Sequence, residues 1–206
     1  MALQPCLTEP ITMLSDTSVV INLNATGCAD AVLRALPHRV AVIDIVRAEL
    51  DSGSPRERND AALIGRLVDD DLIKVVSLNE TASLLFETLV IGPSAMTLDD
   101  GEAATIAYAV ANGATAVIDE KKANRICAER FPGLPVICTV DLLAHPAVRS
   151  RLGDALLADA VYGALYHGRM RVPLHHRAWV IELVGMTRAA ECVSLPRSAR
   201  ASYETS

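Results

Sequence analysis

Aromatic side chains are scarce in this 206-residue chain, which has two Phe, one Trp and four Tyr. Apolar residues nevertheless make up 51% of the sequence and charged residues 21%, which excludes the disordered class. Aliphatic side chains must therefore fill the interior. The length is in the range expected for one domain with a small appendage.

Paired cysteine motifs are also missing. The five cysteines are scattered, odd in number and free of any C-x-x-C pair: Cys6, Cys28, Cys127, Cys138 and Cys192. This pattern is typical of reduced, mostly buried thiols, so it predicts a cytoplasmic protein without a zinc site.

The chain has no long apolar run. Its longest stretch without a charge, residues 103–118, is interrupted by Asn112 and Gly113, which indicate a turn. A spanning helix would need about 18 or more apolar residues, so we expect no membrane segment. No basic region followed by an apolar core begins the sequence, so we expect no secretory signal.

Short β-like runs alternate with helical patterns along the chain. Strands are expected at residues 11–15, 39–43, 73–76, 116–118 and 136–138. Helices are expected at residues 31–36, 45–50, 56–71, 80–89, 102–110, 121–130, 154–166 and 175–184. This alternation predicts βαβ units, a parallel sheet and the α/β fold class. The domain is expected to cover residues 1–190, with 191–206 as a flexible tail.

Two acids directly follow predicted strands, Asp16 after the first and Asp119 after residues 116–118. In an open parallel sheet the carboxyl ends of the strands face the binding crevice, so both acids should approach one site. Glu49 and Glu102 lie on helices next to strands. Four converging carboxylates require bound cations or raised pKa values, and hard oxygen ligands suit Mg²⁺ or Mn²⁺. Metals held in this way hydrolyse phosphodiesters without a protein nucleophile.

Each acid also has a structural interpretation. Asp16 is suited to cap a helix, and Asp119 could cap the one that begins near Lys121. Glu49 and Glu102 could be ordinary solvated helix positions. Taken singly, none of the four acids decides between these interpretations.

Several ordered motifs resemble the PIN-domain family, in its bacterial and archaeal branch with a Leu-x-x-Gly-Glu motif. The resemblance rests on Leu14-Ser15-Asp16-Thr17-Ser18, Val46-Arg47-Ala48-Glu49-Leu50, Leu98-Asp99-Asp100-Gly101-Glu102 and Ala116-Val117-Ile118-Asp119-Glu120. It covers roughly residues 11–187. The chain departs from the family pattern at Cys138, where the family usually has glycine before a threonine. A thiol at this position is expected to narrow the pocket.

The resemblance implies a three-layer, Rossmann-like α/β/α fold with extra C-terminal helices, and a metal-dependent endoribonuclease. The implied catalytic acids are Asp16, Glu49, Glu102 and Asp119. Among them, Asp16, Glu102 and Asp119 are the implied ligands of Mg²⁺ or Mn²⁺, while Glu49 would orient a metal-bound water. The residues implied to hydrogen-bond a carboxylate or a phosphate are Thr17, Ser18 and Thr139. Asp99 could replace Glu102 if the helix begins earlier than residue 102.

The implied partners are an RNA substrate and, if the protein is the toxin of a toxin–antitoxin pair, an antitoxin protein. Basic residues are in the minority, 19 against 25 acidic ones, but residues 145–206 hold eight arginines against five acids. Arg169, Arg171 and Arg177 are candidates for contact with RNA phosphates or an acidic partner, although solvated surface positions explain most arginines equally well. Aliphatic helix faces exceed what one sheet needs, which favours a homodimer.

Two other functions fit parts of the sequence. One is a non-catalytic, PIN-like module for binding or dimerisation. The other is a nucleotide-binding α/β protein, which is disfavoured because no glycine-rich phosphate loop follows the first strand.

Overall fold

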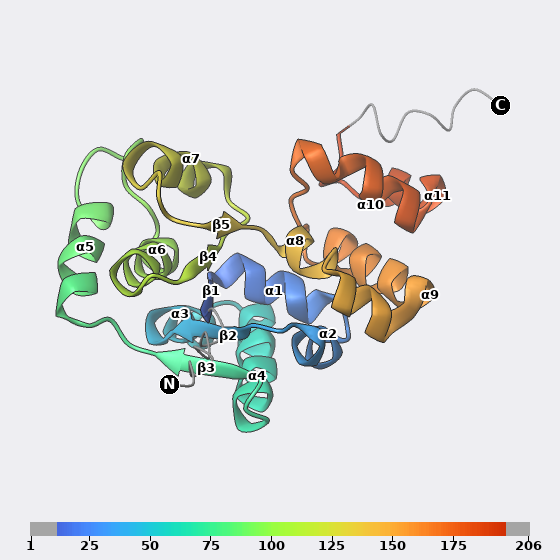
Figure 1. Ribbon diagram of the computed structural model, residues 1–206, viewed down its shortest axis with the longest axis horizontal. Helices are drawn as coiled ribbons and strands as arrows, with labels where there is room; N and C mark the ends of the chain where they lie inside the picture. Colours follow the sequence, from blue (N-terminus) through green and yellow to red (C-terminus); the bar gives the residue numbers. More distant parts are fainter. Residues whose placement is uncertain (1–11, 197–206) are drawn as a thin grey trace, which may run out of the picture.

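Five parallel strands form the centre of the protein, seen here in a computed structural model (Figure 1). The structure describes residues 12–196 and, within them, all side chains except those of residues 55–58. The strands are β1 (Thr12–Ser15), β2 (Arg39–Ile43), β3 (Ile73–Val76), β4 (Thr115–Val117) and β5 (Val136–Ile137). Their order in the sheet is β3-β2-β1-β4-β5, and every neighbouring pair is parallel.

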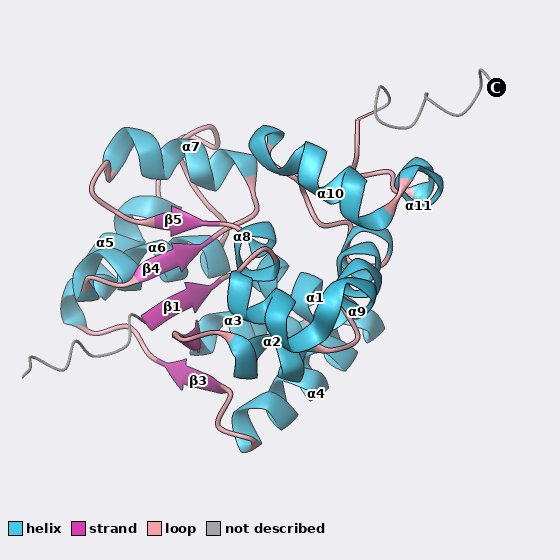
Figure 2. Ribbon diagram, turned by 45° about the vertical axis from the view of Figure 1, so that its right-hand side comes forward, coloured by secondary structure: helices cyan, strands magenta, loops and turns pink. Residues whose placement is uncertain are grey.

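Helices flank the sheet in a three-layer α/β/α arrangement (Figure 2). They are α1 (Thr17–Ala25), α2 (Ala29–Ala35), α3 (Asp44–Ser52), α4 (Pro55–Asp69), α5 (Glu80–Val90), α6 (Asp100–Asn112), α7 (Lys121–Arg130), α8 (Thr139–Leu143), α9 (Pro146–Tyr166), α10 (Arg177–Val184) and α11 (Met186–Glu191). A short 3₁₀ helix, Leu174–His176, precedes α10. The expected α/β class, parallel sheet and additional C-terminal helices are confirmed.

Small side chains allow α6 to approach the sheet closely. Ala103, Ala104 and Ala107 are fully buried where α6 packs against β1, β2 and β4. This packing explains how a chain with few aromatic residues closes its core, because alanine and branched aliphatic side chains fill the space between the layers. Gly113 ends α6 in a left-handed conformation (φ +64°) and turns the chain into β4.

The C-terminal helices form a second cluster at one end of the molecule (Figure 1). There α9 packs against α1, α2 and α8, and α10 packs on α9. Cys192 and Leu195 are buried, so packed structure continues past the expected boundary at residue 190. Residues 1–11, with Cys6 and the first predicted strand residue, and residues 197–206 of the predicted tail lie outside the described residues. Within the described part, no helix combines the length and apolar character needed to cross a bilayer.

The predicted strands 39–43 and 73–76 and the predicted helix 121–130 agree with the structure. Helix α1 was not predicted, because its run Val19-Val20-Ile21 is β-branched and typical of a strand. The first half of α9 was also missed, because Gly153 (φ +71°) kinks the helix and its sequence pattern begins again there. Helix α6 begins at Asp100, two residues earlier than predicted.

Candidate functional site

The sheet places Asp16 and Asp119 at its topological switch point. Asp16 follows β1, Asp119 follows Ile118 after β4, and these two strands are neighbours. From β1 the chain continues to β2 and β3 on one side, whereas β4 and β5 lie on the other. In open α/β sheets, ligands bind outside the carboxyl ends of the strands at this point.

Asp16 is 1% exposed, and its two carboxylate oxygens have different surroundings. Oδ1 accepts hydrogen bonds from the Val19 backbone N–H (2.8 Å) and the Ser18 hydroxyl (2.9 Å), so Asp16 does cap α1. Oδ2 is buried and has no hydrogen-bond partner among the described residues. Burial raises the pKa of Asp16 from 3.8 to about 7, with a smaller contribution from the charge of Asp119. The capping role therefore uses only one of the two oxygens.

Asp119 is 5% exposed and is held by three donors. Oδ1 accepts from the Thr139 backbone N–H (2.8 Å), while Oδ2 accepts from the Thr139 hydroxyl (2.6 Å) and the Asn22 side-chain amide (2.6 Å). Burial raises the pKa of Asp119, and the hydrogen bonds from Thr139 and Asn22 oppose this effect. The alternative role of Asp119 as a helix cap is wrong, because Glu120 caps α7. Asn22 lies on α1, which was not predicted as a helix, so the sequence pattern did not identify it.

Glu49 is fixed against α6 by a close backbone approach. Its Oε1 accepts from the Gly101 N–H (2.8 Å), and its Oε2 accepts from the Thr17 hydroxyl (2.5 Å). A Cβ atom on residue 101 would lie 2.5 Å from Glu49 Oε2 and 2.9 Å from Thr17 Oγ1. A side chain at residue 101 would push the Glu49 carboxylate away, so glycine lets Glu49 keep this position, which gives a physical reason for the Gly-Glu pair at residues 101 and 102.

An acidic pocket of about 470 Å³ opens beside these groups. Its charged lining consists of Asp16, Glu49, Asp99, Glu102 and Glu120. Burial raises the pKa of Glu102 from 4.5 to about 7, and the charges of Glu120 and Asp99 add to this. Helix α6 begins earlier than predicted, at Asp100, which is the condition under which Asp99 could take the place of Glu102, and both acids line the pocket.

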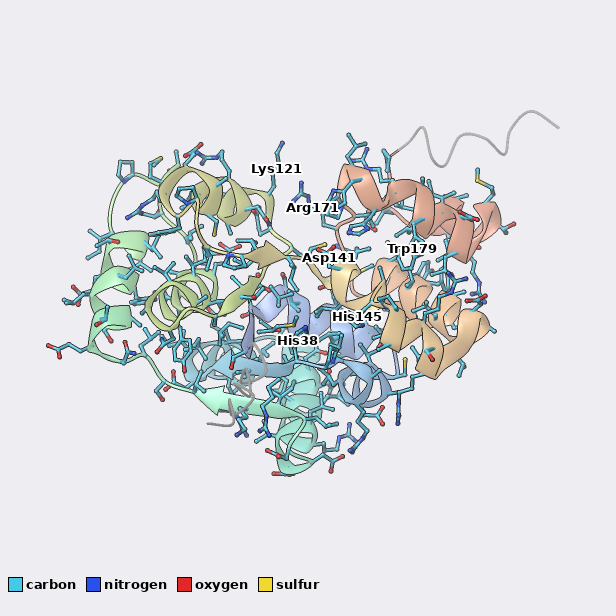
Figure 3. All side chains as sticks on the ribbon, in the orientation of Figure 1. His38, Lys121, Asp141, His145, Arg171 and Trp179 are labelled. Carbon is cyan, nitrogen blue, oxygen red and sulfur yellow. The ribbon has the colours of Figure 1, made fainter. Side chains whose placement is uncertain are left out.

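A second cavity of about 400 Å³ adjoins the acidic pocket and carries basic residues. Asp119, Lys121, Arg169 and Arg171 contribute to its lining, and it shares Ser18, Ile21 and Glu120 with the acidic pocket. Arg171 also donates to the backbone oxygen of Asp119 (3.2 Å). Figure 3 shows Lys121 and Arg171 on the side of the molecule where α7 faces α10.

The structure therefore separates the three predicted arginines. Arg169 and Arg171 line this basic cavity, whereas Arg177 lines neither cavity. Lys121 was missed, because in the sequence it is only the first residue of a helix. Cys138 was expected to narrow the pocket, and this is wrong: its thiol is directed to Asp141 instead.

The spacing of the acids bears on how an ion would be bound. Among the described side chains, three potential metal-ligating atoms lie within 4.8 Å of one another only at Cys138, Asp141 and His176, outside the acidic pocket. Asp16, Glu102 and Asp119 form no such trio. Hard oxygen donors, one of them buried and unpartnered, still fit a hydrated divalent cation, because Mg²⁺ keeps several waters and takes one or two carboxylates.

Comparison with known proteins places the chain in a family. A family model described as a PIN domain matches residues 12–163, well over half of the chain. No curated protein and no solved structure matches. The chain therefore belongs to the PIN-domain family, whose members are generally nucleases that use divalent metal ions.

Proposed function

We propose that this PIN-domain protein is a metal-dependent endoribonuclease that hydrolyses RNA phosphodiester bonds with Mg²⁺ or Mn²⁺. Its proposed catalytic acids are Asp16, Glu49, Glu102 and Asp119, with Asp16, Glu102 and Asp119 as metal ligands. The observation that carries the proposal is the second oxygen of Asp16, which is buried at the switch point of the sheet with no donor in the described part of the chain. An anionic oxygen in this situation is stabilised by a cation.

The remaining groups have roles that follow from their contacts. A bound divalent ion supplies a water of lowered pKa and neutralises charge that develops on the phosphate. Thr139 and Asn22 hold Asp119 in one orientation, so its carboxylate need not reorganise to bind an ion. Glu49, fixed by Gly101 and Thr17, stands at the pocket wall, where it can orient a water.

The basic cavity supports a polynucleotide substrate. Lys121, Arg169 and Arg171 lie beside the acidic pocket, so they can bind phosphates that flank the one being cleaved. A net charge of −6 does not oppose this interaction, because part of the acidic excess lines the pocket that would hold cations. RNA rather than DNA is the substrate that the family resemblance implies.

Cleavage of short, fluorophore-labelled RNA in Mg²⁺ or Mn²⁺ tests the proposal, with EDTA and a DNA strand of the same sequence as references. Asp16→Asn should abolish cleavage and keep the fold, because Asn retains the Oδ1 that caps α1. Asp100→Asn is the matched control, since Asp100 is an exposed acid at the N-terminal end of a different helix, α6, and lines neither cavity. No cleavage by the wild type under any metal condition would contradict the proposal and leave the non-catalytic binding module.

We further propose that the protein is a cytoplasmic homodimer and acts as the toxin of a toxin–antitoxin pair. Exposed aliphatic side chains such as Leu84 and Ile91 on and beside α5 support an interface, being 62% and 73% exposed. Light scattering of the purified protein measures the oligomeric state. Induced expression should stop growth in the wild type and not in Asp16→Asn, and an equal effect of both would contradict the toxin role.

A further inference from the structure

A second group of metal-ligating side chains lies outside the acidic pocket. Cys138 lies between β5 and α8, Asp141 lies on α8, and His176 lies on the 3₁₀ helix that leads into α10. One ligand atom from each lies within 4.8 Å of the other two. None of the three residues lines the acidic pocket or the basic cavity.

Hydrogen bonds already gather these side chains around Asp141. Asp141 Oδ1 lies 2.7 Å from His176 Nε2. Its Oδ2 accepts from the Cys138 backbone N–H (2.8 Å) and from the Cys138 thiol (3.1 Å). In Figure 3, Asp141 lies at α8, on the side toward α10 and its Trp179.

The surroundings are partly closed. Cys138 is 7% exposed, and the side chains of His176 and Asp141 are 16% and 35% exposed. Trp179 packs near His176, with ring centroids 6.5 Å apart. The trio is therefore partly shielded by protein and partly open to solvent.

We propose that Cys138, Asp141 and His176 bind Zn²⁺, with water as the fourth ligand. A thiolate, an imidazole and a carboxylate are ligands typical of zinc, whereas Mg²⁺ takes oxygen ligands. From Zn–S of about 2.3 Å and Zn–N or Zn–O of about 2.0–2.1 Å, tetrahedral ligand atoms lie about 3.3–3.6 Å apart. The ligand atoms of the trio lie within 4.8 Å of one another, so an ion needs only a local adjustment. It would replace the hydrogen bonds of Asp141 to His176 (2.7 Å) and to the Cys138 thiol (3.1 Å), and these atoms would move slightly apart.

Binding exchanges a proton for the ion. Burial and the hydrogen bond to Asp141 raise the pKa of the Cys138 thiol from 9.0 to about 12, so in the metal-free protein the proton stays on sulfur. The S–H bond breaks and the S–Zn bond forms, and the thiol proton leaves to solvent. The Nε2–H of the neutral His176 ring, which faces Asp141 in the metal-free protein, moves to Nδ1, so that Nε2 is free to bind the ion, which stays Zn²⁺.

Because of where the site lies, bound zinc would hold residues next to Asp119 in place. Cys138 immediately precedes Thr139, which holds Asp119 with its backbone N–H and its hydroxyl. His176 belongs to the segment that follows Arg171. A bound ion would join the C-terminal helices to the residues between β5 and α8. It would thereby limit the movement of Thr139 and Arg171, which both contact Asp119. The inference goes beyond the proposed nuclease function and does not depend on it.

Co²⁺, a spectroscopic substitute for zinc, tests the site in the full-length protein. We expect one equivalent of Co²⁺ to give a thiolate-to-cobalt charge-transfer band and visible bands of tetrahedral cobalt, with release of one proton. Zn²⁺ should bleach these bands. Asp141→Asn should weaken Zn²⁺ binding by about tenfold or more in competition with a chromophoric chelator.

Variants separate this site from the acidic pocket. Cys138→Ser should remove the charge-transfer band, and His176→Ala should weaken Co²⁺ binding at least about tenfold. Cys28→Ser, a partly exposed cysteine elsewhere, and Asp16→Asn should leave the band intact. A charge-transfer band that survives in folded Cys138→Ser, or its absence from the wild type at saturating Co²⁺, would overturn the proposal. Because the band is read without RNA, its loss and a failure of RNA cleavage are separate results.

Discussion

Replacing Asp16 by Asn should stabilise the metal-free protein at pH 8 and have little net effect on its stability at pH 5. The carboxyl of Asp16 has a pKa of about 7 in the folded protein and 3.8 as its ordinary value. A raised folded pKa means that folded stability is intact below pH 3.8, falls as the pH rises toward 7, and is fully reduced above 7. Three pKa units correspond to about 4 kcal/mol.

The asparagine variant carries no buried charge, so it does not lose stability as the pH rises, but its amide group destabilises the fold in another way. Its Oδ1 keeps the capping hydrogen bonds, whereas its amide group replaces an oxygen that has no donor. A buried amide without a partner costs about 1–3 kcal/mol. We therefore expect a net stabilisation of about 1–3 kcal/mol at pH 8. At pH 5 the folded wild-type carboxyl is protonated, but the unfolded one is already ionised, so the penalty is only about 1.6 kcal/mol. It nearly balances the cost of the buried amide, and we expect a net change within about 1 kcal/mol of zero.

Urea unfolding in EDTA at pH 5 and pH 8 measures both differences. Each kcal/mol corresponds to about 2–4 °C in Tm for a chain of this size, so thermal melts give a second reading. Mn²⁺ should raise the Tm of the wild type and have little effect on the variant, because the ion stabilises only a state that binds it. Asp100→Asn, the exposed control, should follow the wild type throughout.

One result would refute the reasoning. If Asp16→Asn destabilises the protein equally at pH 5 and pH 8, Asp16 carries no buried charge at pH 8. The unpartnered Oδ2 would then be a protonated group in the working protein, and a cation would gain nothing from it.

Three further changes address the walls of the site. Gly101→Ala should displace the Glu49 carboxylate, cost about 1–3 kcal/mol in urea unfolding, and reduce cleavage, because the new Cβ would lie 2.5 Å from Oε2. Thr139→Val should weaken Mn²⁺ binding in calorimetry and cost about 1–3 kcal/mol, since one donor to the buried Asp119 is lost. Arg171→Ala should weaken RNA binding and lower its salt dependence by about one unit of slope, as one phosphate contact is removed.

Matched controls exist for these changes. An added Cβ at Gly133 meets open space, so Gly133→Ala should leave stability and cleavage unchanged. Arg151 is exposed and distant in sequence from the lining of either cavity, so Arg151→Ala should keep the RNA affinity. Equal effects of Gly101→Ala and Gly133→Ala, or of Arg171→Ala and Arg151→Ala, would contradict the assigned contacts.

Local patterns predicted much of the fold. The runs at residues 39–43 and 73–76 form strands, and residues 121–130 form a helix, because in these segments side-chain period and propensity agree with the tertiary environment. Helix α1 shows the opposite case. Its β-branched run Val19-Val20-Ile21 is typical of a strand, but the Asp16 cap and packing against α9 make it a helix.

The same division applies to the site. By itself, the sequence determined the acids at strand ends, the Gly-Glu pair and the α/β class, since these depend on neighbouring residues and on the direction of parallel strands. Only the tertiary structure decided which groups meet: Asn22 with Asp119 across 97 positions, Gly101 with Glu49 across 52, and His176 with Asp141 across 35. The reason is physical, because these contacts form when packed layers bring distant segments together, and no local pattern encodes their distance.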